Sequence, residues 1–117
     1  MKKIRVILSK NANEAYLELT ANSKESKLEK SLLKSINHKI DLIKLNPHLG
    51  NPISKDKIPK IYKTQFEITN LFRVELTNFW RMDYTLKSNE TEIEIIAFVL
   101  NIMSHEKYNK IYEYNKK

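Results

Sequence analysis

The clearest pattern in the chain is an alternation of apolar and polar residues between Leu71 and Leu86. Asn78 suits the loop of a hairpin there, because asparagine tolerates a left-handed backbone. A three-residue loop at 77–79 sets apolar residues opposite one another on one side and opposite charges on the other. A two-residue loop would set apolar residues against charged ones, and side-chain period fixes the register. The pattern therefore predicts the apolar pairs Phe72–Tyr84, Val74–Met82 and Leu76–Trp80 and the charged pairs Arg73–Asp83 and Glu75–Arg81.

One face of this hairpin is expected to close a core, and the other is expected to display Arg73 and Arg81. The apolar run from Thr91 to Leu100 predicts a more buried strand beside the hairpin. Alternation from Lys2 to Leu8 predicts an N-terminal strand, since its apolar stretch is too short for a signal peptide.

Two stretches show the spacing of amphipathic helices. The first is predicted to start at Asn11, with Glu14 as the acidic partner in a capping box, and to end near Thr20. The second starts at Ser26 and ends near Leu45, where Pro47 and Gly50 stop it. Its apolar stripe is formed by Leu28, Leu32, Ile36, Ile40 and Ile43. The two helices are expected to form an antiparallel hairpin.

The remaining segments are shorter. Residues 53–63 are predicted to be a basic connector that Ile58, Ile61 and Tyr62 fasten to the core. Ser104 is expected to cap a short C-terminal helix that carries Tyr108, Ile111 and Tyr112. The fold class is thus α+β in a single domain, residues 1–117: an N-terminal strand, an antiparallel two-helix hairpin, a three-stranded antiparallel meander and a short C-terminal helix.

Composition narrows the function classes. The chain has 117 residues, of which 41% are hydrophobic and 30% charged, as in an ordinary folded domain. The absence of cysteine excludes disulfides and thiol chemistry. With no cysteine, the cytoplasm is the expected compartment, and no apolar run is long enough to span a membrane. The histidines at 38, 48 and 105 lack metal-ligand spacing, and we expect neither a metal nor a cofactor.

The formal net charge of +7 favours an anionic partner, either nucleic acid or an acidic protein. A lysine-rich proteome is the alternative source of this charge. Lys55, Lys57 and Lys60 could steer phosphate, or they could simply solvate a loop.

The order of these elements resembles the RelE/ParE toxin superfamily. The resemblance is carried by a helix hairpin, the loop NPHLGNPI at 46–53, the hairpin LFRV…FWRMDYTL, the strand IEIIAFVL and a short final helix, and it covers essentially the whole chain. It implies a small sheet cradled by two N-terminal helices, a basic cleft and a cognate antitoxin as partner. RelE-like members cut messenger RNA on the ribosome, whereas ParE-like members inhibit DNA gyrase.

The RelE-type reaction is cleavage of the RNA backbone by a 2′-hydroxyl. It needs a base, cations to neutralise phosphate charge and an acid for the leaving oxygen, which arginine, lysine, tyrosine and histidine can supply without a metal. By resemblance, Arg73 and Arg81 would hold phosphate and His105 would act as acid or base. Tyr108 or Tyr112 would stack on a base, and Tyr108 is also a candidate for proton transfer.

Three departures from the family pattern keep other functions open. Glu75 lies where RNA-cutting members usually carry a basic residue, the hairpin is one residue longer, and the segment NIMSHEKYNKIY lacks a C-terminal arginine. The leading interpretation is a RelE-like toxin that acts as a ribosome-dependent, metal-independent endoribonuclease on messenger RNA. The alternatives are a ParE-like gyrase inhibitor and an inactive member that only binds its antitoxin. Structurally, ion pairs could satisfy Arg73 and Arg81, and the tyrosines could serve packing.

Overall fold

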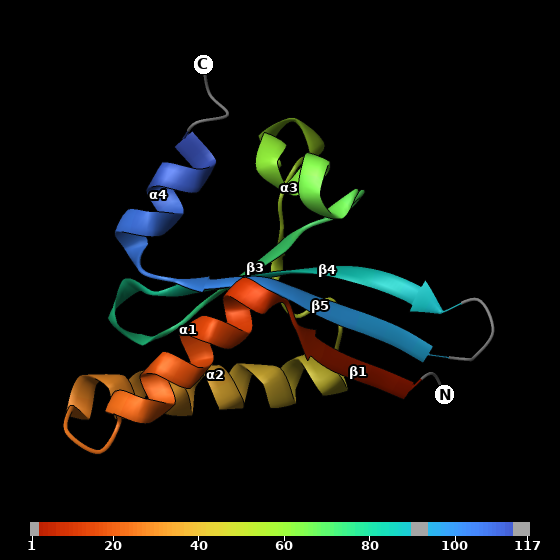
Figure 1. The fold of residues 1–117 in the computed structure, drawn as a ribbon. Coiled ribbons are helices and arrows are strands. Elements are labelled where there is room, and N and C mark those ends of the chain that lie inside the picture. Colours follow the sequence, from red (N-terminus) through yellow and green to blue (C-terminus); the bar gives the residue numbers. More distant parts are fainter. Residues whose placement is uncertain (1–2, 90–93, 114–117) are drawn as a thin grey trace.

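A computed structural model describes residues 3–89 and 94–113. One mixed sheet lies between two pairs of helices, with α1 and α2 on one face and α3 and α4 on the other (Figure 1). Its strands, in spatial order, are β1 (Lys3–Leu8), β5 (Glu94–Met103), β4 (Arg81–Asn89), β3 (Phe72–Glu75) and β2 (Asn51–Pro52). The helices are α1 (Lys10–Asn22), α2 (Lys27–Leu45), α3 (Lys60–Phe66) and α4 (His105–Glu113), with single 3-10 turns at η1 (Lys55–Lys57) and η2 (Thr77–Phe79).

The predicted fold class is confirmed. Strands β3, β4 and β5 form the antiparallel meander, and β1 joins β5 in parallel. The predicted start of the last strand at Thr91 lies outside the described residues. The short β2 and the helix α3 were not predicted, because two and seven residues are too few to show a period.

The predicted hairpin register is also confirmed. Phe72 pairs with Tyr84, Val74 with Met82, Arg73 with Asp83 and Glu75 with Arg81, and the Leu76 amide donates to the Trp80 carbonyl. Asn78 adopts the left-handed backbone expected of it, with φ 58°. Phe79 does the same, with φ 63°, which was not expected of a bulky residue.

The helix starts were predicted correctly at two of three places. Ser26 Oγ accepts from the Glu29 amide at 3.3 Å, and Ser104 Oγ accepts from the Lys107 amide at 3.3 Å. The cap of α1 is Ser9 and not Asn11. Buried Ser9 accepts from the Ala12 amide at 3.0 Å and donates to the Leu100 carbonyl at 2.6 Å, so it also ties the helix to β5.

The main core lies between the helices α1 and α2 and the sheet. Leu32, Ile36 and Ile43 are buried there as predicted, against Val74, Met82 and Tyr84 of the hairpin. Leu28 was wrongly placed in this stripe and is 51% exposed. The reason is its position at the start of α2, where the two helices project past the sheet (Figure 1).

The sole glycine serves packing rather than the end of a helix. Helix α2 ends at Leu45, five residues before it, with Asn46 as the C-cap. A Cβ at Gly50 would lie 3.0 Å from both the Arg73 carbonyl oxygen and the Phe72 Cβ. The backbone at Gly50 can therefore approach Tyr84 closely. The Tyr84 hydroxyl accepts from the Gly50 amide and donates to the Pro47 carbonyl.

The opposite face of the sheet is covered, whereas an open display of arginines was expected. A second cluster beneath α3 and α4 buries Ile58 and Tyr62, as predicted, together with Ile68, Leu71 and Leu100. Ile61 was predicted to join them but is half-exposed, because it precedes the buried Tyr62 in α3 and so points about 100° away from it around the helix.

Candidate functional site

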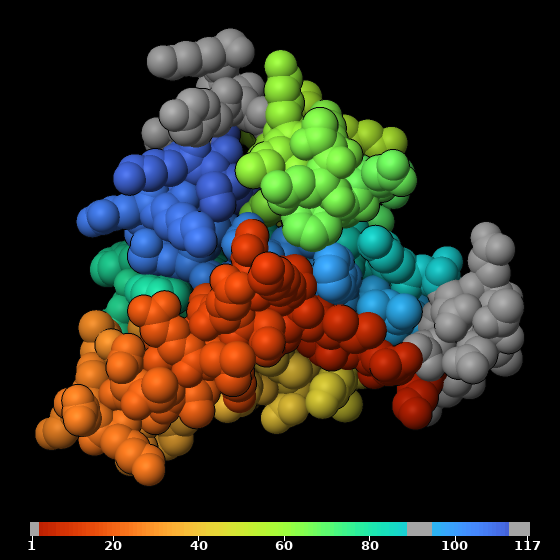
Figure 2. Space-filling view, viewed as in Figure 1, coloured from red at the N-terminus to blue at the C-terminus, as the bar shows by residue number. Residues whose placement is uncertain are grey.

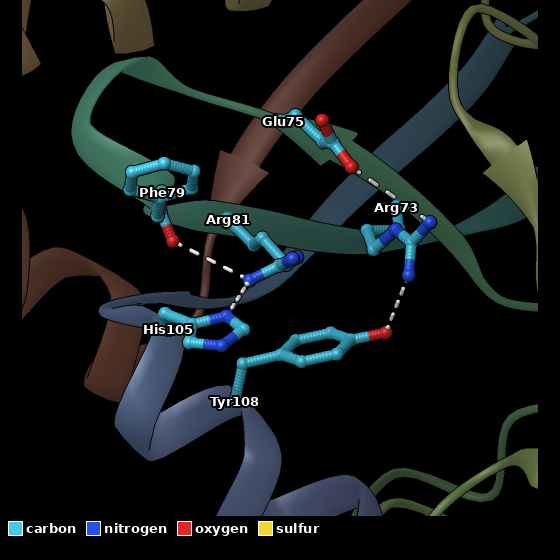
Figure 3. A network of polar contacts seen from close by, with 6 residues as sticks. All are labelled: Arg73, Glu75, Phe79, Arg81, His105 and Tyr108. Carbon is cyan, nitrogen blue, oxygen red and sulfur yellow. Dashed lines mark hydrogen bonds and ion pairs between the residues drawn. The ribbon is translucent and has the colours of Figure 1, made fainter.

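Four of the predicted site residues meet where α4 crosses the hairpin (Figure 3). Strands β3 and β4 supply Arg73 and Arg81, and α4 supplies His105 and Tyr108. The guanidinium carbons lie 5.6 Å (Arg73) and 4.7 Å (Arg81) from the centre of the Tyr108 ring. Two cations thus lie within about 6 Å of one aromatic ring, and the ring quadrupole attracts both of them.

Arg73 is held from two sides. Its Nη1 donates to the Tyr108 hydroxyl at 3.0 Å, and its Nη2 lies 4.0 Å from a Glu75 carboxylate oxygen (Figure 3). The hydrogen bond to Tyr108 is the main cause that raises the pKa of Arg73 above its ordinary value. The contact with the exposed Glu75 is at the limit for an ion pair and contributes only about 0–1 kcal/mol.

Arg81 lies against His105. Its Nη1 is 2.6 Å from His105 Nδ1 and 3.4 Å from the Phe79 carbonyl oxygen. Since arginine can only donate, Nδ1 must carry a lone pair in this arrangement. The ring proton is then on Nε2, and Asn109 Nδ2, itself a donor, lies 3.2 Å from that atom. Both contacts are satisfied only if the Asn109 amide is turned so that its oxygen accepts from Nε2–H. Arg81 therefore keeps an imidazole nitrogen free of protons at the centre of the site.

The predicted charge pair between Arg73 and Asp83 is wrong, although the register behind it is right. Asp83 is fully buried and accepts from Tyr62 (2.5 Å), Tyr112 (2.8 Å) and the Asn101 amide (2.9 Å). Arg81 likewise turns to His105, so the predicted contact with Glu75 across the hairpin is replaced. Among the described residues, neither guanidinium group has a close carboxylate, apart from the long contact of Arg73 with Glu75.

The position of Asp83 follows from an irregularity in β5. The register shifts after Asp83, which pairs with Asn101 while Tyr84 pairs with Val99. Such a bulge leaves a backbone amide outside the ladder, and a buried amide needs an acceptor. Asp83 provides it. Burial is the main cause that raises the pKa of Asp83 to about 6, and burial beside this carboxyl also raises the pKa of Tyr62 and Tyr112.

Tyr108 is tightly enclosed. Its ring stacks on Tyr112 with centroids 4.1 Å apart, Arg81 lies over it, and only 9% of the residue is exposed. The Tyr108 ring therefore serves packing, as one of the two interpretations held, while its hydroxyl still accepts from Arg73. In this arrangement Tyr108 offers no open face for a base.

The lysines and arginines fall into separate groups. Lys55 and Lys57 lie on η1 and Lys60 begins α3, and all three are exposed. The cluster of Arg73, Arg81, His105 and Tyr108 lies instead between the hairpin and α4 (Figure 3). A cation that sequence reasoning missed is Lys39 of α2, which lines a hollow of about 220 Å³ together with Asn51, Arg73 and Glu75.

Both arginines have unsatisfied donors. The Nε atoms of Arg73 and Arg81 are buried and lack a hydrogen-bond partner among the described residues. A buried donor without an acceptor costs about 1–3 kcal/mol. An anion that draws either guanidinium outward would satisfy that donor.

Within residues 3–89 and 94–113, no cluster of histidine and carboxylate side chains could hold a metal, and no helix is long and apolar enough to cross a membrane.

Comparison with known proteins gives one informative result. No family model matches the chain, and neither does any curated protein. Among solved structures, the chain is similar to a mutant of the toxin RelE from E. coli in the free state. The similarity has a TM-score of 0.51 at 12% identity and covers 97% of this chain and 93% of the other. The α+β architecture is therefore a RelE-like fold, as the resemblance implied.

Proposed function

We propose that this protein is a RelE-like toxin that cuts messenger RNA on the ribosome without a metal, in the cytoplasm, and is neutralised by an antitoxin. The observation that carries the proposal is the pair Arg73 and Arg81. Among the described residues the pair has no close carboxylate but Glu75, and Arg81 lies against His105 Nδ1. The fold shared with the toxin RelE supports the toxin part of it.

The reaction proceeds by attack of a ribose 2′-oxygen on the adjacent phosphorus. The 2′-oxygen gives up its proton, the bond from phosphorus to the 5′-oxygen breaks, and that oxygen takes a proton. The products are a 2′,3′-cyclic phosphate and a 5′-hydroxyl. Arg73 and Arg81 neutralise the charge that develops on the phosphate, which is the largest contribution in such reactions.

Proton transfer falls to the groups next to the arginines. When Arg81 turns to the phosphate, it releases His105 Nδ1, which can then accept the 2′-proton. The Tyr108 hydroxyl accepts from Arg73 and retains its own proton, which it can donate to the leaving oxygen. The exposed Lys55, Lys57 and Lys60 contribute long-range attraction for RNA.

A non-enzymatic function has one observation in its favour. Glu75 contacts Arg73 and lowers the positive potential of the site, which fits a ParE-like gyrase inhibitor or a domain that only binds its antitoxin. The cleavage assay below therefore needs a supercoiling assay with purified gyrase beside it.

The test is cleavage of messenger RNA in a reconstituted translation reaction, mapped by primer extension. We expect the wild type to cut, and Arg81→Ala to lose at least about a hundredfold in rate, since it removes a phosphate contact and the partner of His105. Arg5→Ala is the matched control, because it removes the same charge from β1, away from the site, and should cut normally.

Equal cutting by Arg81→Ala and the wild type would overturn the assignment of the site. If the protein abolishes supercoiling by gyrase and cuts no messenger RNA, gyrase inhibition is favoured. If neither activity is found, the protein is left with antitoxin binding alone.

A further inference from the structure

The tip of the hairpin holds an aromatic side chain in an unfavourable backbone conformation. Asn78 and Phe79 both have positive φ, 58° and 63°. Asparagine tolerates this region, but a bulky residue there is a clear outlier. Three-residue hairpin loops normally carry glycine at such a position. Strain of this kind persists where a side chain has a function that glycine cannot supply.

The Phe79 side chain is not used for packing in the core. The residue is 78% exposed, and it is the one aromatic among the large apolar residues of the described chain that are at least half-exposed. The others in that group are Leu17, Leu28, Leu45 and Ile61. An exposed aromatic ring of this kind costs free energy in water unless a partner covers it.

Phe79 belongs to the arginine site by position. Its carbonyl oxygen accepts from Arg81 at 3.4 Å, and its ring centre lies 6.5 Å from that of His105, at an interplanar angle of 60° (Figure 3). The Tyr108 ring is enclosed between Tyr112 and Arg81 and has no face to offer. Phe79 is therefore the accessible aromatic surface beside the two guanidinium groups.

We propose that Phe79 stacks on an unpaired nucleobase next to the phosphate that Arg73 and Arg81 hold. Single-stranded RNA presents this combination, a charged backbone and bases with open faces. The charge of the neighbouring residues favours this ligand over an apolar protein segment. The proposal rests on the proposed function, because it needs RNA at the arginine site, and it deepens that function by assigning a base contact.

The first experiment measures binding of short, uncleavable 2′-O-methyl RNA by fluorescence anisotropy, with a single abasic position moved along the strand. Phe79→Leu keeps an apolar side chain but removes the aromatic face, and Phe79→Trp keeps the face. We expect Phe79→Leu to bind the intact strand about tenfold more weakly, as loss of one stacked base implies. Leu45→Ala, a change at another exposed apolar residue, should bind like the wild type.

The abasic series tests the contact itself. For the wild type and Phe79→Trp, one abasic position should weaken binding about tenfold, and for Phe79→Leu the same position should have no effect. If Phe79→Leu loses as much at that position as the wild type does, the base contact is absent. Arg81→Ala should weaken binding to every strand equally.

Phe79→Gly separates a binding role from a structural one. Glycine adopts positive φ without strain, so this variant should unfold at a higher temperature than the wild type while binding RNA more weakly. A lower unfolding temperature with unchanged binding would show a structural residue and overturn the proposal. Strong RNA binding that depends on Arg81 but not on Phe79 would overturn this proposal alone. Failure of the wild type to bind any strand would overturn the base contact, whereas the proposed function is decided separately by cleavage in the translation reaction.

Discussion

The two faces of the sheet are built by different means. The face under α1 and α2 is covered by an apolar core around Leu32, Ile36 and Ile43. On the other face, α3 and α4 lie next to each other (Figure 2), and the Tyr62 and Tyr112 rings are 6.2 Å apart. There a smaller apolar cluster surrounds a buried carboxylate and its hydroxyl donors. The first face supplies stability, and the second positions α4 and with it His105 and Tyr108.

This difference explains how Arg73 and Arg81 keep their charge available for an anionic ligand. A buried acid one strand away from Arg73 would ordinarily capture its charge. Asp83 instead receives two phenol hydroxyls and a backbone amide, which satisfy its oxygens. The carboxylate can therefore lie behind the site without neutralising the guanidinium groups.

The largest effect is expected from a change on the apolar face. Ile36→Ala should lower the free energy of unfolding by about 2–5 kcal/mol, because Ile36 is fully buried and its truncation leaves a cavity. Cleavage per folded molecule should be unchanged, since the residue does not touch the site. Urea unfolding and an activity measured at a temperature where the variant is folded will check both parts. A loss of activity in the folded variant would show that the two faces are coupled.

A smaller, pH-dependent effect is expected from Asp83→Asn. Burial raises the pKa of Asp83 to about 6 in the folded protein, above its unfolded value of 3.8. The folded state then binds more protons in this interval, so the contribution of Asp83 to stability falls as pH rises from about 4 towards 7. Asparagine has no such dependence. The variant should gain roughly 2 kcal/mol relative to the wild type over that interval.

Urea unfolding of both proteins at several pH values measures this difference directly. Because only the change with pH is used, a constant loss from altered hydrogen bonds does not affect the result. Parallel stability curves for the two proteins would contradict a raised pKa for Asp83. We also expect Asp83→Asn to lower cleavage, because Tyr112 and α4 lose their anchor, whereas Ile36→Ala should not.

The sequence predicted those features of the fold that follow from a regular spacing of apolar residues along one segment. Alternation between Leu71 and Leu86 fixed the hairpin register, and the spacing of Leu32, Ile36 and Ile43 fixed one face of α2. The partners of Asp83 could not be found this way, because Tyr62 and Tyr112 lie 21 and 29 residues away on short helices. The bulge that exposes the Asn101 amide also leaves no local signal.

The candidate site was predicted in composition but not in geometry. Arg73, Arg81, His105 and Tyr108 were all named from the sequence, and they meet in space. Their mutual contacts depend on how α4 packs on the sheet, which no periodicity in a nine-residue helix specifies. Phe79 was read only as a loop residue, although a phenylalanine in a tight turn was a signal in itself.

The central claim is that Arg73 and Arg81 have donors available for the RNA phosphate. The chain has three arginines, so their side-chain Nε–H signals in an NMR spectrum can be assigned with single Arg→Lys variants. Titration with a short single-stranded RNA should move the signals of Arg73 and Arg81 together and leave that of Arg5 in place. If these two signals stay fixed while RNA binds elsewhere, or if Arg5 moves as much as they do, the account of the site is wrong.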